Sequence, residues 1–152
     1  MVIQAEDPNT ADIRALLAEH LADMASHSPP DSMHALDIAA LQKPDVRFFT
    51  CRENDNLLGC GAYKLFDKNC AEIKSMKTAT AYLRKGVAAA LLEHIIQACR
   101  GEGVNRLYLE TGSPDAFLPA RKLYERYGFS EVPPFGDYTL DPYSVFMRLT
   151  LT

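Results

Sequence analysis

Residues 83–92 constrain the fold more than any other part of the chain, because they join a strand end, a basic loop and a helix start. The stretch reads Leu-Arg-Lys-Gly-Val-Ala-Ala-Ala-Leu-Leu and follows an apolar, strand-like run over residues 71–76. After Gly86, apolar side chains recur at the spacing of one helix face: Ala88, Leu91, Leu92, Ile95, Ile96 and Cys99. The sequence therefore predicts a strand, a short basic loop with one glycine, and an amphipathic helix.

This loop has the properties of an anion-binding site. The first amides of a helix lack intrahelical partners and carry partial positive charge, so a helix start can hold a phosphate or pyrophosphate. Gly86 lets the backbone approach a ligand, and the small Ala88 and Ala89 keep the first turn open. Arg84 and Lys85 add positive charge. The motifs of phosphate-loop NTPases and of dinucleotide-binding folds are both absent.

Composition narrows the class of protein. The chain has 152 residues, 47% hydrophobic and 24% charged, as expected of one globular domain with a sizeable core. A net charge of −4 gives no support for general nucleic-acid binding. Without an 18-residue apolar run or a signal-peptide pattern, we expect a cytoplasmic protein with no membrane partner. The four cysteines show no C-x-x-C pairing, and we expect free thiols and no metal site.

Turn residues and hydrophobic periodicity divide the whole chain into four helices and about seven strands. The predicted helices are 13–24, 31–42, 86–100 and 119–127, and the predicted strands are 2–5, 46–51, 57–65, 70–78, 104–111, 129–132 and 144–150. The early strands should pair antiparallel, whereas the helix between the fourth and fifth strands predicts a parallel pair. The order β α α β β β α β α β β describes one α/β (α+β) domain with a mixed central sheet over residues 1–152.

Two motifs resemble those of the GNAT family of N-acetyltransferases. Residues 83–88 are similar to the family's coenzyme A pyrophosphate loop, Q/R-x-x-G-x-G/A, with Leu83 at the first position. Residues 123–129 are similar to its L-Y-x-x-x-G-F segment, with Ala120 at the expected spacing and Phe117 where many members carry Asn. The order of elements is similar to the family's fold over nearly the whole chain, which looks like a branch of small bacterial members.

The resemblance implies that acetyl-CoA is the cosubstrate and indicates which residues bind it. These residues come from the loop and from the strand before it: Met76, Lys77, Thr78, Arg84, Lys85, Gly86, Val87, Ala88 and Ala89. The backbone of 76–78 would hold the pantetheine arm like an added strand, because the strands on either side of the helix splay apart. The amide of Met76 would bind the oxyanion of the tetrahedral intermediate, and Lys77, Arg84 and Lys85 would meet phosphates.

The resemblance also implies two catalytic residues. Tyr124 would be the general acid, because a phenol with a pKa near ~10 is protonated at neutral pH and can donate to the departing sulfur. Glu72, on the strand before the loop, would be the base, and strand alternation predicts that it shares a side with Lys74 and Met76. His34, with an unperturbed pKa near ~6.5, is the rival base. The sequence leaves open a core role for Tyr124 and an ion pair between Glu72 and Lys74.

The acceptor of the acetyl group is predicted only as a class. Acidic residues near the expected cleft (Asp37, Glu72, Asp137 and Asp141) favour a cationic amine. His34 and Asp37 would bind this substrate, and Phe135 and Tyr138 would wall its pocket. We therefore expect acetyl transfer to a primary amine, by direct attack in a ternary complex.

Alternatives to this function remain at the level of sequence. The acceptor is expected to be a small molecule, with a protein lysine or N-terminal amine as the second choice. The departures at Leu83 and Phe117 motivate a different class of protein, an acyl-CoA-binding sensor or interaction module without turnover. The exposed edge of the final strand pair allows a homodimer.

Overall fold

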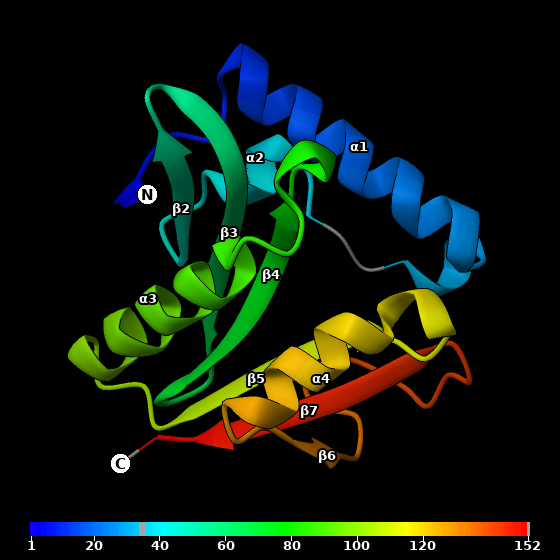
Figure 1. The fold of residues 1–152 in the computed structure, drawn as a ribbon. Helices are drawn as coiled ribbons and strands as arrows, with labels where there is room; N and C mark the ends of the chain where they lie inside the picture. The colour runs from blue at the N-terminus through cyan, green and yellow to red at the C-terminus, as the bar shows by residue number, and fades with distance from the viewer. Residues whose placement is uncertain (34–35, 152) are drawn as a thin grey trace.

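The structure is a computed structural model that describes residues 1–33 and 36–151, and these residues form one seven-stranded sheet (Figure 1). The strands lie in the order β1-β2-β3-β4-β5-β7-β6. Their bounds are β1 Val2–Ala5, β2 Val46–Glu53, β3 Asn56–Phe66, β4 Cys70–Thr78, β5 Arg106–Gly112, β6 Ser130–Val132 and β7 Ser144–Thr150. The β4–β5 pair is parallel and the other neighbouring pairs are antiparallel. The predicted fold class and order of elements are confirmed.

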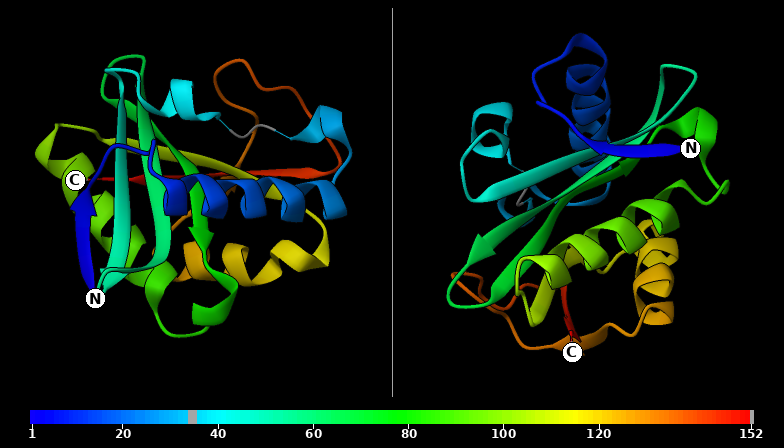
Figure 2. Two further views of the ribbon diagram at one scale, coloured as in Figure 1. Left: turned by 90° about the horizontal axis from the view of Figure 1, so that it is seen from above. Right: turned by 90° about the vertical axis from the view of Figure 1, so that its left-hand side faces the viewer.

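Helices cover both faces of the sheet (Figure 2). In the described residues they are α1 Ala11–His27, α2 Ile38–Leu41, α3 Val87–Gly101 and α4 Leu118–Arg126. Strand alternation divides the apolar residues into two cores: Phe48 packs toward α1 and its neighbour Phe49 packs toward α3. None of the helices described in residues 1–33 and 36–151 is long and apolar enough to cross a bilayer.

The predicted second helix, 31–42, is wrong as a continuous helix. The described part of this segment holds a single 3-10 turn, Pro30–Ser32, and the one-turn helix α2. Met33 and Asp37 have extended backbone, so a helix cannot run through them. Asp37 instead begins α2, because its carboxylate accepts a hydrogen bond from the Ala40 amide at 2.8 Å.

A bulge in β4 changes which side chains share a face. In the pairing with β3, Cys60 faces Lys77 and Ala62 faces Lys74, so two residues of β4 oppose the single Gly61. Within the bulge Ser75 has a φ of 55°. A side chain on Gly61 would overlap the Met76 thioether, which therefore lies on the α3 face. The prediction that Met76 shares a side with Glu72 and Lys74 is therefore wrong.

The parallel pair at the centre of the sheet is short, and this positions the site. β4 and β5 pair only from Cys70–Arg106 to Glu72–Tyr108. Beyond this point the two strands diverge, although β4 continues to Thr78 and β5 to Gly112. The parallel pairing and the divergence that the sequence predicted are both present.

Candidate active site

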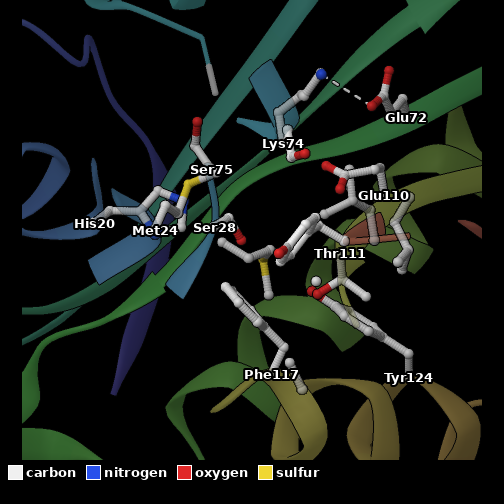
Figure 3. Close-up of a pocket in the computed structure, with 17 residues that line it drawn as sticks. His20, Met24, Ser28, Glu72, Lys74, Ser75, Glu110, Thr111, Phe117 and Tyr124 are labelled. Carbon is white, nitrogen blue, oxygen red and sulfur yellow. Dashed lines mark ion pairs between the residues drawn. The ribbon is translucent and has the colours of Figure 1, made fainter. Parts of the chain in front are cut away.

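A cavity of about 140 Å³ lies where β4 and β5 diverge (Figure 3). Its walls come from the second half of α1, from both strands, from α4 and from the turn before α4. They include His20, Met24, Glu72, Lys74, Ser75, Met76, Glu110, Thr111, Phe117 and Tyr124. The fold therefore brings Tyr124 and Glu72, which are far apart in the sequence, to one cavity.

Tyr124 is placed by α4, a helix that has Pro119 in its first turn and buries Leu123 and Tyr124. Its ring packs edge-on against Phe129, with 5.6 Å between ring centroids. Burial raises the pKa of the Tyr124 phenol to about 12. The phenol is therefore protonated at neutral pH and can act as a proton donor.

Glu72 is a buried carboxylate with two polar partners. Lys74 Nζ lies 2.9 Å from its carboxylate, and the Tyr138 hydroxyl donates a hydrogen bond to it at 2.5 Å. Lys74 also donates to the Tyr138 oxygen at 2.8 Å. Burial and the neighbouring Glu72 raise the pKa of Tyr138. The ion pair that the sequence left open is thus present, and these contacts orient the Glu72 carboxylate.

Sequence reasoning missed a second carboxyl group, Glu110 on β5. Burial raises its pKa to about 7, and the nearby carboxylate of Glu72 acts in the same direction. Figure 3 shows Glu110 beside Lys74 and Thr111 in the cavity. The sequence contained evidence for this position of Glu110. Leu107 and Leu109 share the core face of the strand, so Glu110, the next residue, must point to the opposite face.

His20 lies at the α1 end of the same cavity. Burial and the nearby Lys77 lower the pKa of its imidazole to about 4, so the ring is neutral at pH 7. The Lys77 ammonium itself contacts Asp23 and lies 3.7 Å from Glu19, both on α1. The structure therefore directs the Lys77 side chain to α1, whereas the sequence had predicted a phosphate contact.

The predicted anion-binding loop forms the N-terminus of α3. Gly86 is the N-cap with a φ of 82°, and a Cβ there would meet no atom within 4 Å. The glycine is therefore needed for its backbone conformation, and the space beside it is open. Arg84 and Lys85 are exposed, and the Lys85 ammonium lies 5.8 Å from the centre of the Tyr82 ring. The α3 N-terminus thus has open space at Gly86 and two exposed cations in the residues just before it.

A second cavity, of about 380 Å³, meets the first at Glu72 and Lys74. Its walls include Phe135 and Tyr138, which the sequence predicted to wall the acceptor pocket, and Asp137 and Asp141. Among the residues that the structure describes, the other wall residues are Asp31, Leu36, Lys64, Phe66, Gly136 and Thr139. Asp37 is exposed and caps α2, and it is not among these wall residues. His34 lies outside the described residues.

Comparison with known proteins settles the family. The model of the Acetyltransferase (GNAT) family matches residues 13–129. The chain belongs to this family. It is 48% identical to YsnE of Bacillus subtilis (strain 168), an uncharacterized N-acetyltransferase, over 151 residues that cover 99% of this chain and 100% of the relative. This GNAT protein is therefore an acyltransferase, as its two motifs predicted.

Solved structures support the same fold for this GNAT protein. A structure from Klebsiella pneumoniae, named for the acyl-CoA N-acyltransferases, has a TM-score of 0.85 at 27% identity, with coverage of 99% of this chain and 97% of that chain. A Bacillus subtilis acetyltransferase solved in complex with CoA has a TM-score of 0.70 at 14% identity, with coverage of 99% and 98%. At the lower identity, the likeness shows the fold alone.

The two departures from the family motifs have different surroundings in this GNAT protein. Leu83 is 53% exposed. Phe117 lines the first cavity, and its ring fills the space next to Gly112, where a Cβ would overlap it. The same ring packs edge-on against His27 at 6.0 Å. Phe117 therefore shapes the cavity by its volume, where an Asn would offer hydrogen bonds.

Proposed function

We propose that this GNAT protein transfers the acetyl group of acetyl-CoA to a primary amine of a small molecule, by direct attack in a ternary complex. One observation carries the proposal: the cavity between β4 and β5 joins the protonated phenol of Tyr124 to the carboxyl groups of Glu72 and Glu110. Aminolysis of a thioester needs these two kinds of group, because a proton must leave the nitrogen and another must reach the sulfur.

The α3 N-terminus suits the pyrophosphate of the coenzyme. Its first amides are free, Gly86 leaves the space beside them open, and Arg84 and Lys85 supply positive charge. The β4 backbone at 76–78 runs past the last residue that pairs with β5, so its edge is available to the pantetheine arm. A solved acetyltransferase with the same fold contains CoA, which supports this assignment.

The chemistry follows from the groups in the cavity. The amine gives its proton to Glu110, whose pKa of about 7 lies near the working pH, while Glu72 attracts the incoming ammonium. The nitrogen attacks the thioester carbon, and the Met76 amide donates to the oxyanion. The C–S bond then breaks as Tyr124 protonates the sulfur, and the nitrogen gives its second proton to the resulting Tyr124 phenolate. The products are an amide and coenzyme A thiol, and the net proton released is the one that Glu110 accepted. Glu72, the base predicted from the sequence, is the alternative proton acceptor.

Replacing Tyr124 by Phe tests the proposal. We expect turnover to fall at least tenfold, because general acid catalysis contributes about 10² to 10⁴ in rate. The KM for acetyl-CoA should change little. Release of the coenzyme A thiol measures both values with a panel of small amines.

The matched control is Tyr127→Phe, because the Tyr127 hydroxyl bonds Glu93 outside the cavity. This variant should retain the wild-type rate. If Tyr124→Phe also kept the full rate, Tyr124 would have no part in the mechanism. If the protein bound acetyl-CoA but released no thiol with any amine, the alternative function, an acyl-CoA-binding sensor or interaction module without turnover, would be favoured.

A further inference from the structure

The wall of the second cavity contains one further lysine, Lys64, together with the carboxyl groups of Asp31, Asp137 and Asp141. Lys64, on β3, is half-buried. Within residues 1–33 and 36–151, its ammonium has no ion pair or hydrogen bond. Lys74, on the next strand, is instead bonded to Glu72 and Tyr138. Because removing charge from water is costly, a half-buried cation of this kind favours an anionic group of a ligand.

The register of the sheet places this cation next to the reaction centre. Lys64 lies directly opposite Glu72, and Glu72 lies opposite Tyr108, so the three side chains form a row on one face. Directly opposite residues of neighbouring strands have Cβ atoms about 4.5–5.5 Å apart. A single small ligand can therefore reach Glu72 with an ammonium and Lys64 with an anion. The ammonium and carboxylate of an α-amino acid, which are bonded to one carbon, suit this arrangement.

The third feature of the cavity is a surface of aromatic rings beside Lys64. Phe66, two residues further along the same face of β3, stacks on Phe135 with centroids 6.0 Å apart and ring planes 26° apart. Tyr108 packs against both rings, at 5.7 Å from Phe66 and 4.6 Å from Phe135. Such a surface favours a flat apolar side chain over a polar one.

We propose that the acceptor is a free aromatic α-amino acid, with its amine at Glu72, its carboxylate at Lys64 and its ring against Phe66 and Phe135. This inference rests on the proposed function, because it names the acceptor of the same acetyl transfer. A protein lysine, a protein N-terminus or a polyamine lacks a carboxylate beside the reacting amine. Each of these would leave Lys64 without an anionic partner.

The experiment compares three acceptors with the wild-type protein: L-phenylalanine, L-phenylalaninamide and phenethylamine. They share an amine and a ring, and only L-phenylalanine has the carboxylate. Thiol release with acetyl-CoA should give a kcat/KM for L-phenylalanine at least tenfold above the other two. Equal or faster reaction of the amide or of phenethylamine would overturn the inference and leave the acetyl transfer standing.

Two lysine variants make the assignment specific to one residue. Lys64→Met should raise the KM for L-phenylalanine about tenfold, with little change in kcat and no change for phenethylamine. Lys68→Met, at the exposed turn between β3 and β4, is the matched control and should match the wild type. An unchanged KM in Lys64→Met would exclude Lys64 as the anchor. Absence of thiol release from every amine tested would instead refute the acetyl transfer itself.

Discussion

At the scale of single residues, burial sets the chemistry of the cavity between β4 and β5. Removal from water disfavours the charged form of any group, so it moves acids and bases in opposite directions. It raises the pKa of Glu110 to about 7 and of Tyr124 to about 12, and it lowers the pKa of His20 to about 4. At pH 7 the cavity therefore offers one group near its midpoint of titration, one protonated donor and one neutral imidazole.

Glu110→Gln tests whether the raised pKa of the Glu110 carboxyl affects the stability of the protein. Because the folded-state pKa lies above its ordinary value of 4.5, the protein loses stability as the pH rises from about 4.5 to about 7. The variant cannot ionise, so its Tm should exceed that of the wild type by a few degrees at pH 8 and match it near pH 4.5. A difference in Tm that does not depend on pH would refute the raised pKa.

The same variant assigns the base. If Glu110 accepts the proton, kcat/KM of the wild type rises with pH through about 7. In Glu110→Gln, the pH profile of kcat/KM should lack this rise. Glu72→Gln is the matched control, because it removes the same charge from the same cavity. If the rise of kcat/KM with pH persisted in Glu110→Gln and disappeared in Glu72→Gln, Glu72 would be the base.

At the scale of elements, the junction between β5 and α4 depends on a close fit. Gly112 ends β5, and any Cβ there would overlap the ring of Phe117, which lies just before α4. The ring in turn forms part of the cavity wall. A residue that departs from the family motif is thus accommodated by a glycine on the neighbouring strand.

Gly112→Ala should destabilise the protein by about 1–3 kcal/mol, because the overlap forces Phe117 or the strand to move. In the Phe117→Ala background the same change should cost much less, and thermal unfolding of the four proteins measures this coupling. The control is Gly101→Ala at the end of α3, where a Cβ meets nothing within 4 Å. Equal costs in both backgrounds would contradict the contact.

The sequence predicts those parts of the fold that are determined by residues close together in the chain. The order of elements follows from hydrophobic periodicity and turn residues, and the loop before α3 follows from Gly86. The helix predicted over 31–42 is wrong because Met33 and Asp37 are extended and Asp37 instead caps α2. The same segment contacts a distant residue, since Ser32 donates to Asp141 at 2.5 Å. The bulge gave no local signal in β4, because Ser75, which is not a glycine, adopts the positive φ.

The candidate site was predictable only in part. Tyr124, predicted from a motif, and Glu72, predicted from its strand, both line the first cavity, and their catalytic roles stay predictions. Glu110 lies on the opposite face of β5 from Leu107 and Leu109, and strand alternation could have shown this. The ion pair of Lys77 with Asp23 could not be foreseen, because Asp23 lies on α1, far from Lys77 in the sequence. The predicted phosphate contact of Lys77 stays a prediction. The pairing of Lys64 with Glu72 depends on register across two strands, which the sequence does not specify by itself.

At the scale of the whole molecule, the site lies where β4 and β5 diverge, and α1, β4, β5 and α4 form its walls. A ligand in this opening contacts both halves of the sheet. Binding of acetyl-CoA should therefore stabilise the whole fold rather than one element. At about 100 times its dissociation constant it should add about 2.7 kcal/mol, which raises the Tm by several degrees.

Thermal unfolding with and without acetyl-CoA measures this effect, with ADP at the same concentration as the control. A clear shift with acetyl-CoA and a small one with ADP is expected, since ADP lacks the pantetheine arm that would pair with residues 76–78. Absence of a shift at millimolar acetyl-CoA would mean that the loop at Gly86 is only a helix start.

The meeting of two cavities at Glu72 and Lys74 has a kinetic consequence. Under the proposed function, the acetyl thioester occupies one cavity and the amine the other, so neither substrate has to fill the space of its partner. This arrangement allows the two substrates to add in either order. A bisubstrate inhibitor would have to span both cavities, with its narrowest part between these two side chains.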